Sequence, residues 1–335
     1  LLCTLFGMLI INNEQKPRAA VKALVLSGTA DLLLMLGIII TVYQAGTPYI
    51  SQIEKLSITG ISAIGFICMM LGAIGKAGCM PFHSWIPVAA EEAPVPFMVA
   101  FPGAIEKLLG IYLTVSIVTN IYEFQPGSIA SIVIMIIGTL TIIFAVAMAL
   151  IQKDMKRLLS YHAISQVGYM VLGIGSALPI GIIGGLFHML NNAVYKSCLF
   201  MTAGSIEKQT GTTDLRKVGG LAKKMPVTMI CFTISGLAIA GLPPFNGFFS
   251  KELIFDAALE SNVIFYLGAL LGAFMTAVSF LKMGRAAFSG SLKLPEKLPE
   301  GKKDVRESGI EMLLPMVILA FLNVIFGIIN TLPLD

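Results

Sequence analysis

The sequence predicts an all-α membrane protein, a polytopic bundle of transmembrane helices. Of its 335 residues, 56% are hydrophobic and only 13% are charged, whereas about a quarter are charged in ordinary soluble domains. Ten apolar stretches run through the chain, and about 20 helical residues are enough to cross the hydrocarbon core of a bilayer. Lysines lie inside several of these stretches, where charge is costly and usually marks a functional site. Together these observations predict a membrane subunit that translocates ions.

The apolar stretches fall, in order, at residues 1–11, 20–44, 57–78, 95–118, 128–151, 158–178, 180–203, 226–258, 261–284 and 310–332. Each except the first is long enough to span a membrane. The first opens in mid-span at Leu1, and no charged region of the kind that begins a signal peptide precedes it. We therefore expect about ten spans here, with further N-terminal spans missing.

The charges in the loops predict the orientation. Almost all loop Lys and Arg residues, Lys156 among them, follow the first, fifth, seventh and ninth stretches, and the alternate loops hold only Lys55. The positive-inside rule places the basic loops in the cytoplasm. We therefore expect a multi-pass protein of the inner (cytoplasmic) cell membrane. The loop at 79–94 departs from the trend, because it carries Glu91 and Glu92 and no Lys or Arg.

Glycine and proline interrupt two of the stretches, at Gly78 and Pro81 and again at Gly241, Pro243 and Pro244. Proline inside a helix removes a backbone hydrogen bond. Such a break persists at membrane depth only where protein or a water-filled cavity satisfies the freed groups. A pair of interrupted helices is the sequence signal for the ion path of a transporter. We therefore expect two broken helices that line such a path.

A lysine lies beside each break, Lys76 at the first and Lys251 at the second, and Lys107 and Lys196 lie in other stretches. A desolvated ammonium group releases its proton readily, so these four lysines are candidate proton carriers. The alternative is that a lysine near a helix end only extends its ammonium group to the membrane surface. That alternative is stronger for Lys251, which has polar neighbours, than for Lys76, which has apolar ones.

His188, Asn192 and Lys196 recur every four residues, which places them on one face of a helix. Histidine accepts and releases protons near neutral pH, so the row predicts a relay that works through water. The structural alternative is a polar row that only holds helices together. His162 lies near one end of its stretch, and we expect it close to a membrane surface as a structural or entry-site group.

Glu106 and Lys107 are adjacent charges within an apolar stretch. Neighbours lie about 100° apart around a helix, so we expect one to face the relay and the other a neighbouring helix. Asp31 is a lone carboxylate in another span, with Lys22 upstream of it. A buried acid next to a lysine lowers the cost of the charge and changes the proton affinity of the lysine.

The sequence offers no signal for a cofactor or a metal. Its five cysteines and three histidines do not have the spacing of zinc or iron–sulfur ligands. The nucleotide-binding glycine motifs are absent from it as well. We therefore expect no metal, no bound cofactor and no redox chemistry in this chain, and no nucleic-acid partner. The energy for transport must then arrive from partner subunits.

Several motifs resemble, in their order along the chain, the signature of the antiporter-like subunits of respiratory complex I. The same subunits occur in membrane-bound hydrogenases and in multisubunit Na⁺/H⁺ antiporters. The matching runs lie at residues 75–87, 93–96, 154–161, 219–221, 241–244 and 249–252. The runs 76–85 and 106–112 are most similar to the hydrogenase branch. The resemblance covers nearly the whole chain.

The resemblance implies a division into inverted-repeat half-channels. Residues 1–118 would form the first half-channel, which is incomplete at its N-terminus, and residues 119–284 the second. Residues 285–335 would form a cytoplasmic loop and a final transmembrane helix. The family's glutamate that partners the first lysine would fall just before Leu1.

The resemblance also assigns roles to single positions. Lys76 is similar to the lysine of the first broken helix, Lys107 to the bridging lysine, Lys196 to the lysine of the second half-channel and Lys251 to the exit lysine. His188 and Asp31 match a family histidine and aspartate, and His83 lies in the first matching run. Asn192 stands where many members have a second histidine, which implies a relay that depends more on water.

The implied function is translocation of protons or Na⁺ within a complex I-like respiratory assembly, of either the hydrogenase or the quinone-reductase type. The other membrane subunits and lipid would be its partners, and iron–sulfur clusters with NiFe, flavin or quinone would lie in partner subunits. The alternative is a subunit of a multisubunit Na⁺/H⁺ antiporter without a redox partner. A structural anchor that no longer conducts is a third interpretation, and the retained lysines argue against it.

Overall fold

The computed structural model describes residues 7–9, 17–299 and 304–329. Within these ranges the secondary structure is helical, and the only strand-like features are three isolated backbone bridges. The predicted all-α class is therefore confirmed. The first predicted span lies almost entirely outside the described residues, as do the last residues of the final one.

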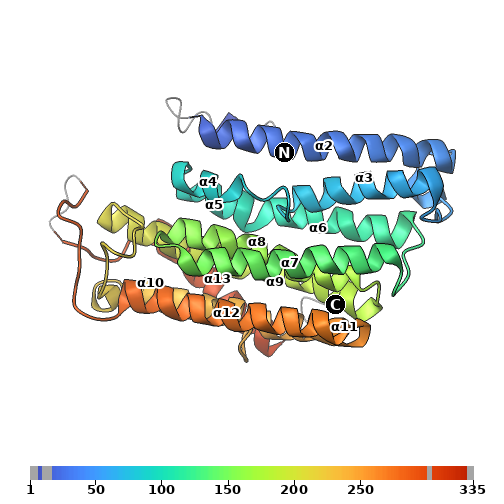
Figure 1. Cartoon of the computed structure of the whole chain (residues 1–335). Coiled ribbons are helices and arrows are strands. Elements are labelled where there is room, and N and C mark those ends of the chain that lie inside the picture. Colours follow the sequence, from blue (N-terminus) through green and yellow to red (C-terminus); the bar gives the residue numbers. More distant parts are fainter. Residues whose placement is uncertain (1–6, 10–16, 300–303, 330–335) are drawn as a thin grey trace.

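Long helices run back and forth along one axis, and short elements cap or interrupt them (Figure 1). The long helices are α2 (Arg18–Ala45), α3 (Gly60–Lys76), α6 (Glu106–Ser116), α7 (Ile129–Ile151), α8 (Met155–Gly175), α9 (Pro179–Thr210), α10 (Pro226–Ala240), α11 (Asn246–Ser261), α12 (Val263–Phe288) and α13 (Ile310–Ile328). The short elements are η1 (Ile50–Gln52), α4 (Ile86–Glu92), α5 (Val95–Ala100), the π-helical turns η2 (Phe101–Ile105) and η3 (Ile117–Ile121), and η4 (Leu221–Lys223).

In the part of the chain that the structure describes, five helical segments are long and apolar enough to cross a membrane: Arg18–Gln52, Val95–Ile121, Ile129–Ile151, Val263–Phe288 and Ile310–Ile328. The chain is therefore a multi-pass membrane protein, although the predicted count of ten spans is not reached by this criterion. Helices α3 and α10 fall short of this criterion because the breaks shorten them. Helices α8 and α9 do not meet it because they carry many polar side chains. Those polar side chains lie inside the bundle, where neighbouring helices rather than lipid surround them.

Both predicted interruptions are present. The helix of α3 ends at Lys76, and α4 continues in the same direction only after the non-helical residues 77–85 (Figure 1). Helix α10 ends at Ala240, and α11 begins at Asn246. Gly78 has a φ of 77° and Gly241 a φ of 81°, a left-handed conformation that favours glycine because it lacks a Cβ atom. The sequence therefore located both breaks.

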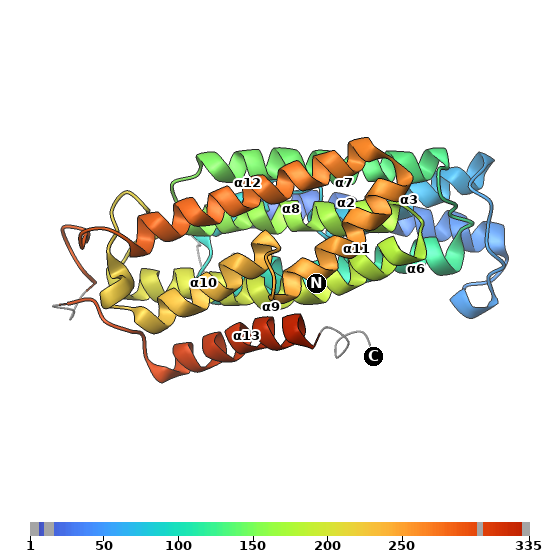
Figure 2. The ribbon, with the colours of Figure 1, turned by 90° about the horizontal axis from the view of Figure 1, so that it is seen from below.

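Helix α8 is the centre of the bundle. Nearly every one of its residues is buried, because α4, α7, α9, α11 and α12 all pack against it. Figure 2 shows α8 between α7 and α12 on one side and α9 on the other. A helix enclosed in this way can carry polar side chains on several faces, since other side chains rather than lipid satisfy them.

The basic loops gather at one end of the bundle. Backbone bridges join Asp154 to Asp214 and Gly219 to Lys293, which brings the loops after α7, α9 and α12 together. The α2–α3 and α6–α7 connections meet at the other end, where a further bridge begins at Leu56. This arrangement is the one that the alternation of loop charge predicts.

The acidic loop that departed from the charge trend also lies at the basic end. Glu91 forms an ion pair with Arg157, and a carboxylate oxygen of Glu92 accepts a hydrogen bond from the backbone N–H of Ala19 at 2.9 Å. Ala19 is in the first turn of α2, where the helix dipole favours an anion. Glu91 therefore pairs with a cation of α8, and Glu92 caps the N-terminus of α2.

Glycine sets the separation of α7 and α8. A methyl group at Gly168 would lie 2.7 Å from the carbonyl oxygen of Gly138 and 2.8 Å from the backbone nitrogen of Ile142. A methyl group at Gly236 in α10 would lie 3.5 Å from the nearest atom, in Phe280.

We expect Gly168→Ala to destabilise the bundle by about 1–3 kcal/mol through overpacking and to lower the midpoint of thermal unfolding in detergent. Gly236→Ala is the matched control, and an equal midpoint for both variants would contradict the close approach.

Candidate functional site

The four lysines predicted as proton carriers all point into the protein. Lys107 and Lys196 are fully buried and Lys251 is 1% exposed, whereas the side chain of Lys76 is 19% exposed. Lys251 therefore does not extend to the membrane surface, which was the alternative considered for it. A buried ammonium group needs acceptors for its hydrogens, and the four lysines find them in different ways.

Lys76, the last residue of α3, forms an ion pair with Asp31 in the middle of α2. The two helices pack side by side, and the pair lies at the first helix break. An acid paired with a lysine was expected at Asp31, but the lysine upstream of it on α2, Lys22, is not the partner. Helix α3 returns antiparallel to α2 and brings a residue 45 positions away into contact.

Glu106 and Lys107 pair with each other, which corrects the expectation that they face different partners. The ammonium group of Lys107 lies 3.0 Å from a carboxylate oxygen of Glu106, and both side chains are buried. The pair begins α6 directly after the π-helical turn η2, and both side chains are long enough to converge across the angle between them. A methyl group at Gly78 would lie 3.2 Å from both charged groups, so the first helix break contacts this pair directly.

Lys196 in α9 donates a hydrogen bond to the backbone carbonyl of Leu159 in α8 at 2.8 Å. The rings of Phe200 and Phe280 lie 5.9 and 6.0 Å from its ammonium nitrogen, within the range of cation–π attraction. No carboxylate among the described residues forms an ion pair with this lysine. Its charge is therefore held only by dipoles and rings.

His188, one helical turn from Asn192 on α9, lies in a polar cluster. Its Nδ1 is 2.9 Å from the hydroxyl of Ser250 in α11, and its Nε2 is 3.1 Å from Oε1 of Gln166 in α8. The hydroxyl of Tyr195 lies 3.3 Å from the same Nε2. The imidazole thus has a polar neighbour at each nitrogen, which is the arrangement that passes a proton from one side of the ring to the other.

Lys251 joins the second helix break to this cluster. Its ammonium group donates to the carbonyl of Ile239 at 2.6 Å, in the last turn of α10, where carbonyl groups lack partners within the helix. The ring of Tyr169 in α8 lies 4.8 Å from the same nitrogen. A methyl group at Gly241 would lie 2.8 Å from the side chain of Lys251, so the glycine makes room for the lysine.

One face of α8 links these groups, and sequence reasoning missed it. Leu159, His162, Gln166 and Tyr169 follow a spacing of three, four and three residues, which places them on one side of the helix. Their partners are Lys196, Ser279, His188 and Lys251, in that order. The ten steps along the helix from Leu159 to Tyr169 cover roughly 15 Å. The three-and-four spacing was the available signal, but two of the contacts use a backbone carbonyl and an aromatic ring.

His162, expected as a structural or entry-site group close to a membrane surface, lies in the second turn of α8. It is fully buried, its Nε2 lies 2.7 Å from the hydroxyl of Ser279 in α12, and its ring packs against Phe280. Helix α8 begins three residues earlier than the predicted stretch, and α12 covers this side of it. His162 therefore belongs to the interior face of α8 rather than to the rim of the bundle.

Buried amides without partners collect beside the second break. Three buried asparagines among the described residues have side-chain atoms without a hydrogen-bond partner. These atoms are both polar atoms of Asn192, both polar atoms of Asn246 and Oδ1 of Asn191. Asn191 donates to the backbone carbonyl of Asn246 at 3.0 Å. Buried polar groups are almost always hydrogen-bonded to protein or to ordered water. These amides therefore favour a hydrated site between α9 and the start of α11.

The remaining predicted residues lie in the breaks. His83 and Pro81 are in the non-helical segment 77–85, and Nδ1 of His83 is buried without a partner in the described part of the chain. Pro243 and Pro244 lie between α10 and α11. No group of three or more His, Cys, Asp or Glu among the described residues has the geometry to hold a metal ion.

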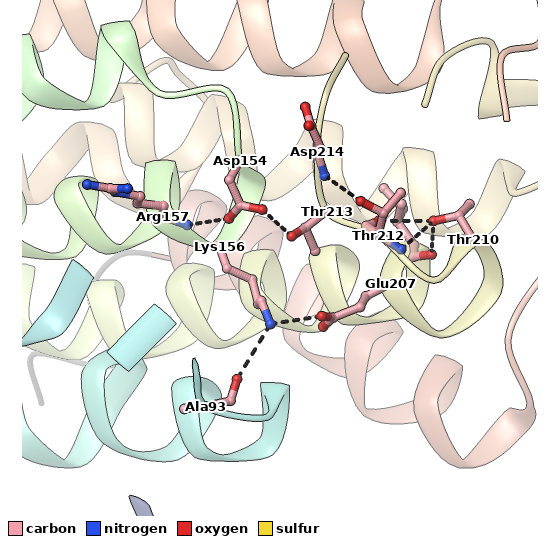
Figure 3. Close-up of polar contacts among 10 residues, drawn as sticks. Ala93, Asp154, Lys156, Arg157, Glu207, Thr210, Thr212, Thr213 and Asp214 are labelled. Atoms are coloured by element: carbon pink, nitrogen blue, oxygen red, sulfur yellow. Dashed lines mark hydrogen bonds and ion pairs between the residues drawn. The ribbon is translucent and has the colours of Figure 1, made fainter. Parts of the chain in front are cut away.

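Lys156, which the sequence analysis assigns to a loop, is also buried. Lys156 is 7% exposed, and its ammonium group lies 2.8 Å from a carboxylate oxygen of Glu207 in α9 and 3.5 Å from the carbonyl of Ala93, between α4 and α5 (Figure 3). Asp154 caps α8 by accepting from the backbone N–H of Arg157 at 3.0 Å. An aspartate before an apolar run is a helix-start signal. That signal places Lys156 in the first turn of α8 rather than in a loop.

The family model described as NADH:quinone oxidoreductase/Mrp antiporter, TM, matches residues 1–276 of this sequence. The chain belongs to this family. It is 34% identical over 315 residues to a Na(+)/H(+) antiporter protein of Alkalihalophilus pseudofirmus, a match that covers 92% of this chain and 62% of that protein. It is 31% identical over 326 residues to NADH-quinone oxidoreductase subunit L of Rickettsia typhi, covering 94% of this chain and 49% of that protein.

The fold matches a chain in the structure of the Mrp complex from Dietzia sp. DQ12-45-1b with a TM-score of 0.89 and 23% identity. The match covers 99% of this chain and 70% of that one. The predicted resemblance to antiporter-like subunits is therefore confirmed, and the chain spans about half to three fifths of the length of the two relatives. One relative is named for antiport and the other for quinone oxidoreduction. Membership of the NADH:quinone oxidoreductase/Mrp antiporter family therefore does not decide whether this chain works in an antiporter or in a quinone oxidoreductase.

The Lys156–Glu207 pair provides a test of the basic end in this family member. We expect Lys156→Met to destabilise the protein by about 1–3 kcal/mol, because it leaves the partly buried Glu207 carboxylate and the Ala93 carbonyl without their donor. Lys153→Met removes an exposed charge from the same segment and is the matched control. Thermal unfolding of both variants in detergent measures the difference. A Lys156→Met midpoint equal to that of wild type would show that the pair adds nothing to stability.

Proposed function

We propose that this chain translocates protons, with Na⁺ as the alternative ion, through the lysines and histidines buried between its two helix breaks. The observation that carries the proposal is the series of interior contacts that one face of α8 makes, from Lys196 through His188 to Lys251. Charged and titratable groups are rare inside membrane bundles and mark ion paths. The division into two half-channels, at 1–118 and 119–284, with 285–335 beyond them, is part of the proposal, as is the count of ten spans.

The lysines differ in how their charge is compensated, which gives the path a direction. Lys76 and Lys107 have carboxylate partners, Asp31 and Glu106, whereas Lys196 and Lys251 have only carbonyls and rings. Separating Glu106 from Lys107 would leave an uncompensated buried ammonium group, which favours loss of its proton. Because α6 packs against α9, that change is felt by Lys196. Protons then pass through His188 and water to Lys251.

The energy for this cycle must come from partner subunits. Moving one charge against 100 mV requires about 2.3 kcal/mol, and one pKa unit corresponds to about 1.4 kcal/mol. A displacement of a carboxylate that shifts a lysine by about two pKa units is therefore sufficient. We propose that the chain works within a multisubunit complex of the inner cell membrane, in contact with lipid and other membrane subunits.

The first candidate assembly is a complex I-like respiratory complex, with iron–sulfur clusters and NiFe, flavin or quinone in partner subunits. The match to the NADH-quinone oxidoreductase protein of Rickettsia typhi supports it, and the hydrogenase branch rests on the runs 76–85 and 106–112. The second candidate is an Mrp-type antiporter without redox partners, which the match to the Alkalihalophilus antiporter protein supports. Purification of the complex with iron analysis separates them, because stoichiometric iron in partner chains contradicts the antiporter and its absence contradicts the respiratory complex.

Replacement of Lys196 tests the path. We expect Lys196→Ala to reduce ion translocation by at least about tenfold in membrane vesicles, since it removes a titratable group from a path with few alternatives. Lys223→Ala, at an exposed position in η4, is the control and is expected to translocate at the wild-type rate. The amount of assembled complex is measured in parallel. Wild-type translocation by an assembled Lys196→Ala variant would end the proposal.

The buried amides without partners allow a second test. We expect Asn192→Leu to slow translocation while the complex still assembles, because an apolar side chain of similar size excludes water from the cluster. Asn192→His is the informative companion, since a histidine there supplies a titratable group and is expected to retain translocation. Equal rates for the Leu variant and wild type would show that water beside Asn192 has no part in the path.

A further inference from the structure

Two hollows on the outside of the bundle adjoin each other at the basic end. The first, of about 340 Å³, is a groove between α10 and α12. The second, of about 680 Å³, lies between the end of α12 and the loop that follows α9. Leu281, Arg285 and Ser289 line both hollows, so the two form one continuous surface. We propose that this surface binds one anionic phospholipid, with an acyl chain in the groove and the phosphate in the second hollow.

The groove has the chemistry and length for an acyl chain. Its walls include Phe232, Gly236 and Ala240 from α10, and Ala277, Phe280 and Gly284 from α12. The small residues leave the space, and the aromatic rings give it apolar sides. Along α10 the lining runs from Met229 to Ala240, which is roughly 16 Å at 1.5 Å per residue. That length is about half of the 30 Å hydrocarbon core, or the depth of one leaflet.

The second hollow has the chemistry for a phosphate group. Lys282, Arg285 and Lys293 line it together with the hydroxyls of Ser289 and Ser291, and no Asp or Glu is among its described lining residues. Lys282 is held in place because its ammonium group donates to the carbonyls of Leu150 and Gln152 at 2.6 and 3.2 Å.

Two of these cations remain available to a ligand. Arg285 and Lys293 are exposed, and within the described ranges neither side chain forms an ion pair with a carboxylate of the protein. The hollow lies at the end where the basic loops gather. The positive-inside rule assigns that end to the cytoplasm, and the cytoplasmic leaflet carries the anionic lipids that basic pockets between transmembrane helices bind.

The lipid would lie directly behind the ion path. Phe280 lines the groove, and the ammonium nitrogen of Lys196 is 6.0 Å from its ring. The ring of His162 packs against the same phenylalanine, with centroids 4.8 Å apart. An acyl chain in the groove supports this ring from outside and keeps water away from the lateral side of Lys196. This consequence depends on the proposed ion path, but the lipid site itself does not.

Native mass spectrometry of the intact complex in detergent, incubated with vesicles of phosphatidylglycerol or phosphatidylcholine, tests the site. We expect the wild-type subunit to retain phosphatidylglycerol in preference to phosphatidylcholine. The double variant Arg285→Gln, Lys293→Gln is expected to weaken retention by at least about tenfold, since each basic residue near the surface contributes about 1 kcal/mol. Lys297→Gln, which removes an exposed charge from the same loop outside the hollow, is expected to bind as wild type.

A substitution that fills the groove distinguishes a bound lipid from a bound soluble anion. We expect Gly236→Leu to lose phosphatidylglycerol while Gly236→Ala keeps it, because a Cβ atom at this position makes only an ordinary contact of 3.5 Å and the longer side chain occupies the groove. Equal retention of the two lipids by wild type, or unchanged retention by the double variant, would overturn the proposal. If Gly236→Leu retains phosphatidylglycerol fully, or if inorganic phosphate alone displaces the lipid, the site binds a soluble anion and the proposed lipid site is wrong. Complexes that keep no lipid because a partner subunit covers the groove would also refute it.

Discussion

A lysine inside an apolar bundle must have acceptors for its ammonium group, and the rest of this structure follows from that constraint. Water is not freely available to solvate the charge, so protein groups replace it. Asp31 and Glu106 do so for Lys76 and Lys107 with full negative charges. Lys196 and Lys251 are instead solvated by the dipoles of backbone carbonyls, one in α8 and one at the end of α10. Lys76 and Lys107 therefore have a full opposite charge beside them, whereas Lys196 and Lys251 have only dipoles and aromatic rings.

The helix breaks follow from the same constraint. A regular helix uses its carbonyl groups internally, so a lysine can reach one most easily where a helix ends. The end of α10 supplies the carbonyl of Ile239 to Lys251, and Gly241 leaves the space through which the side chain passes. At the first break, Gly78 leaves room for Glu106 and Lys107 to pair against it. Each break therefore joins a glycine in a left-handed conformation to a buried charge.

Helix α8 connects these sites because other helices surround it. An enclosed helix can present carbonyl, imidazole, amide and phenol groups along one face without exposing them to lipid. Its basic end is fixed by the Asp154 cap and by the contact of Lys156 with Glu207 and Ala93 (Figure 3). The outer helices α10 and α12 have a different environment, since their outward surfaces form the groove behind Phe280. Polar chemistry therefore lies inside the bundle, and apolar surface lies on its outer side.

The sequence by itself determined the helical class, the positions of both breaks, the four lysines that lie within apolar stretches and the end at which the basic loops gather. Each of these depends on local composition or on spacing along one helix, where the physical rules need no knowledge of neighbours. The tertiary structure alone decided the partners. Asp31 meets Lys76 because α3 returns along α2, Glu106 pairs with its own neighbour, and His162 is enclosed because α12 covers α8. Lys156 is buried for the same reason, since its acceptors, the carbonyl of Ala93 and the carboxylate of Glu207, lie more than fifty residues away in the chain.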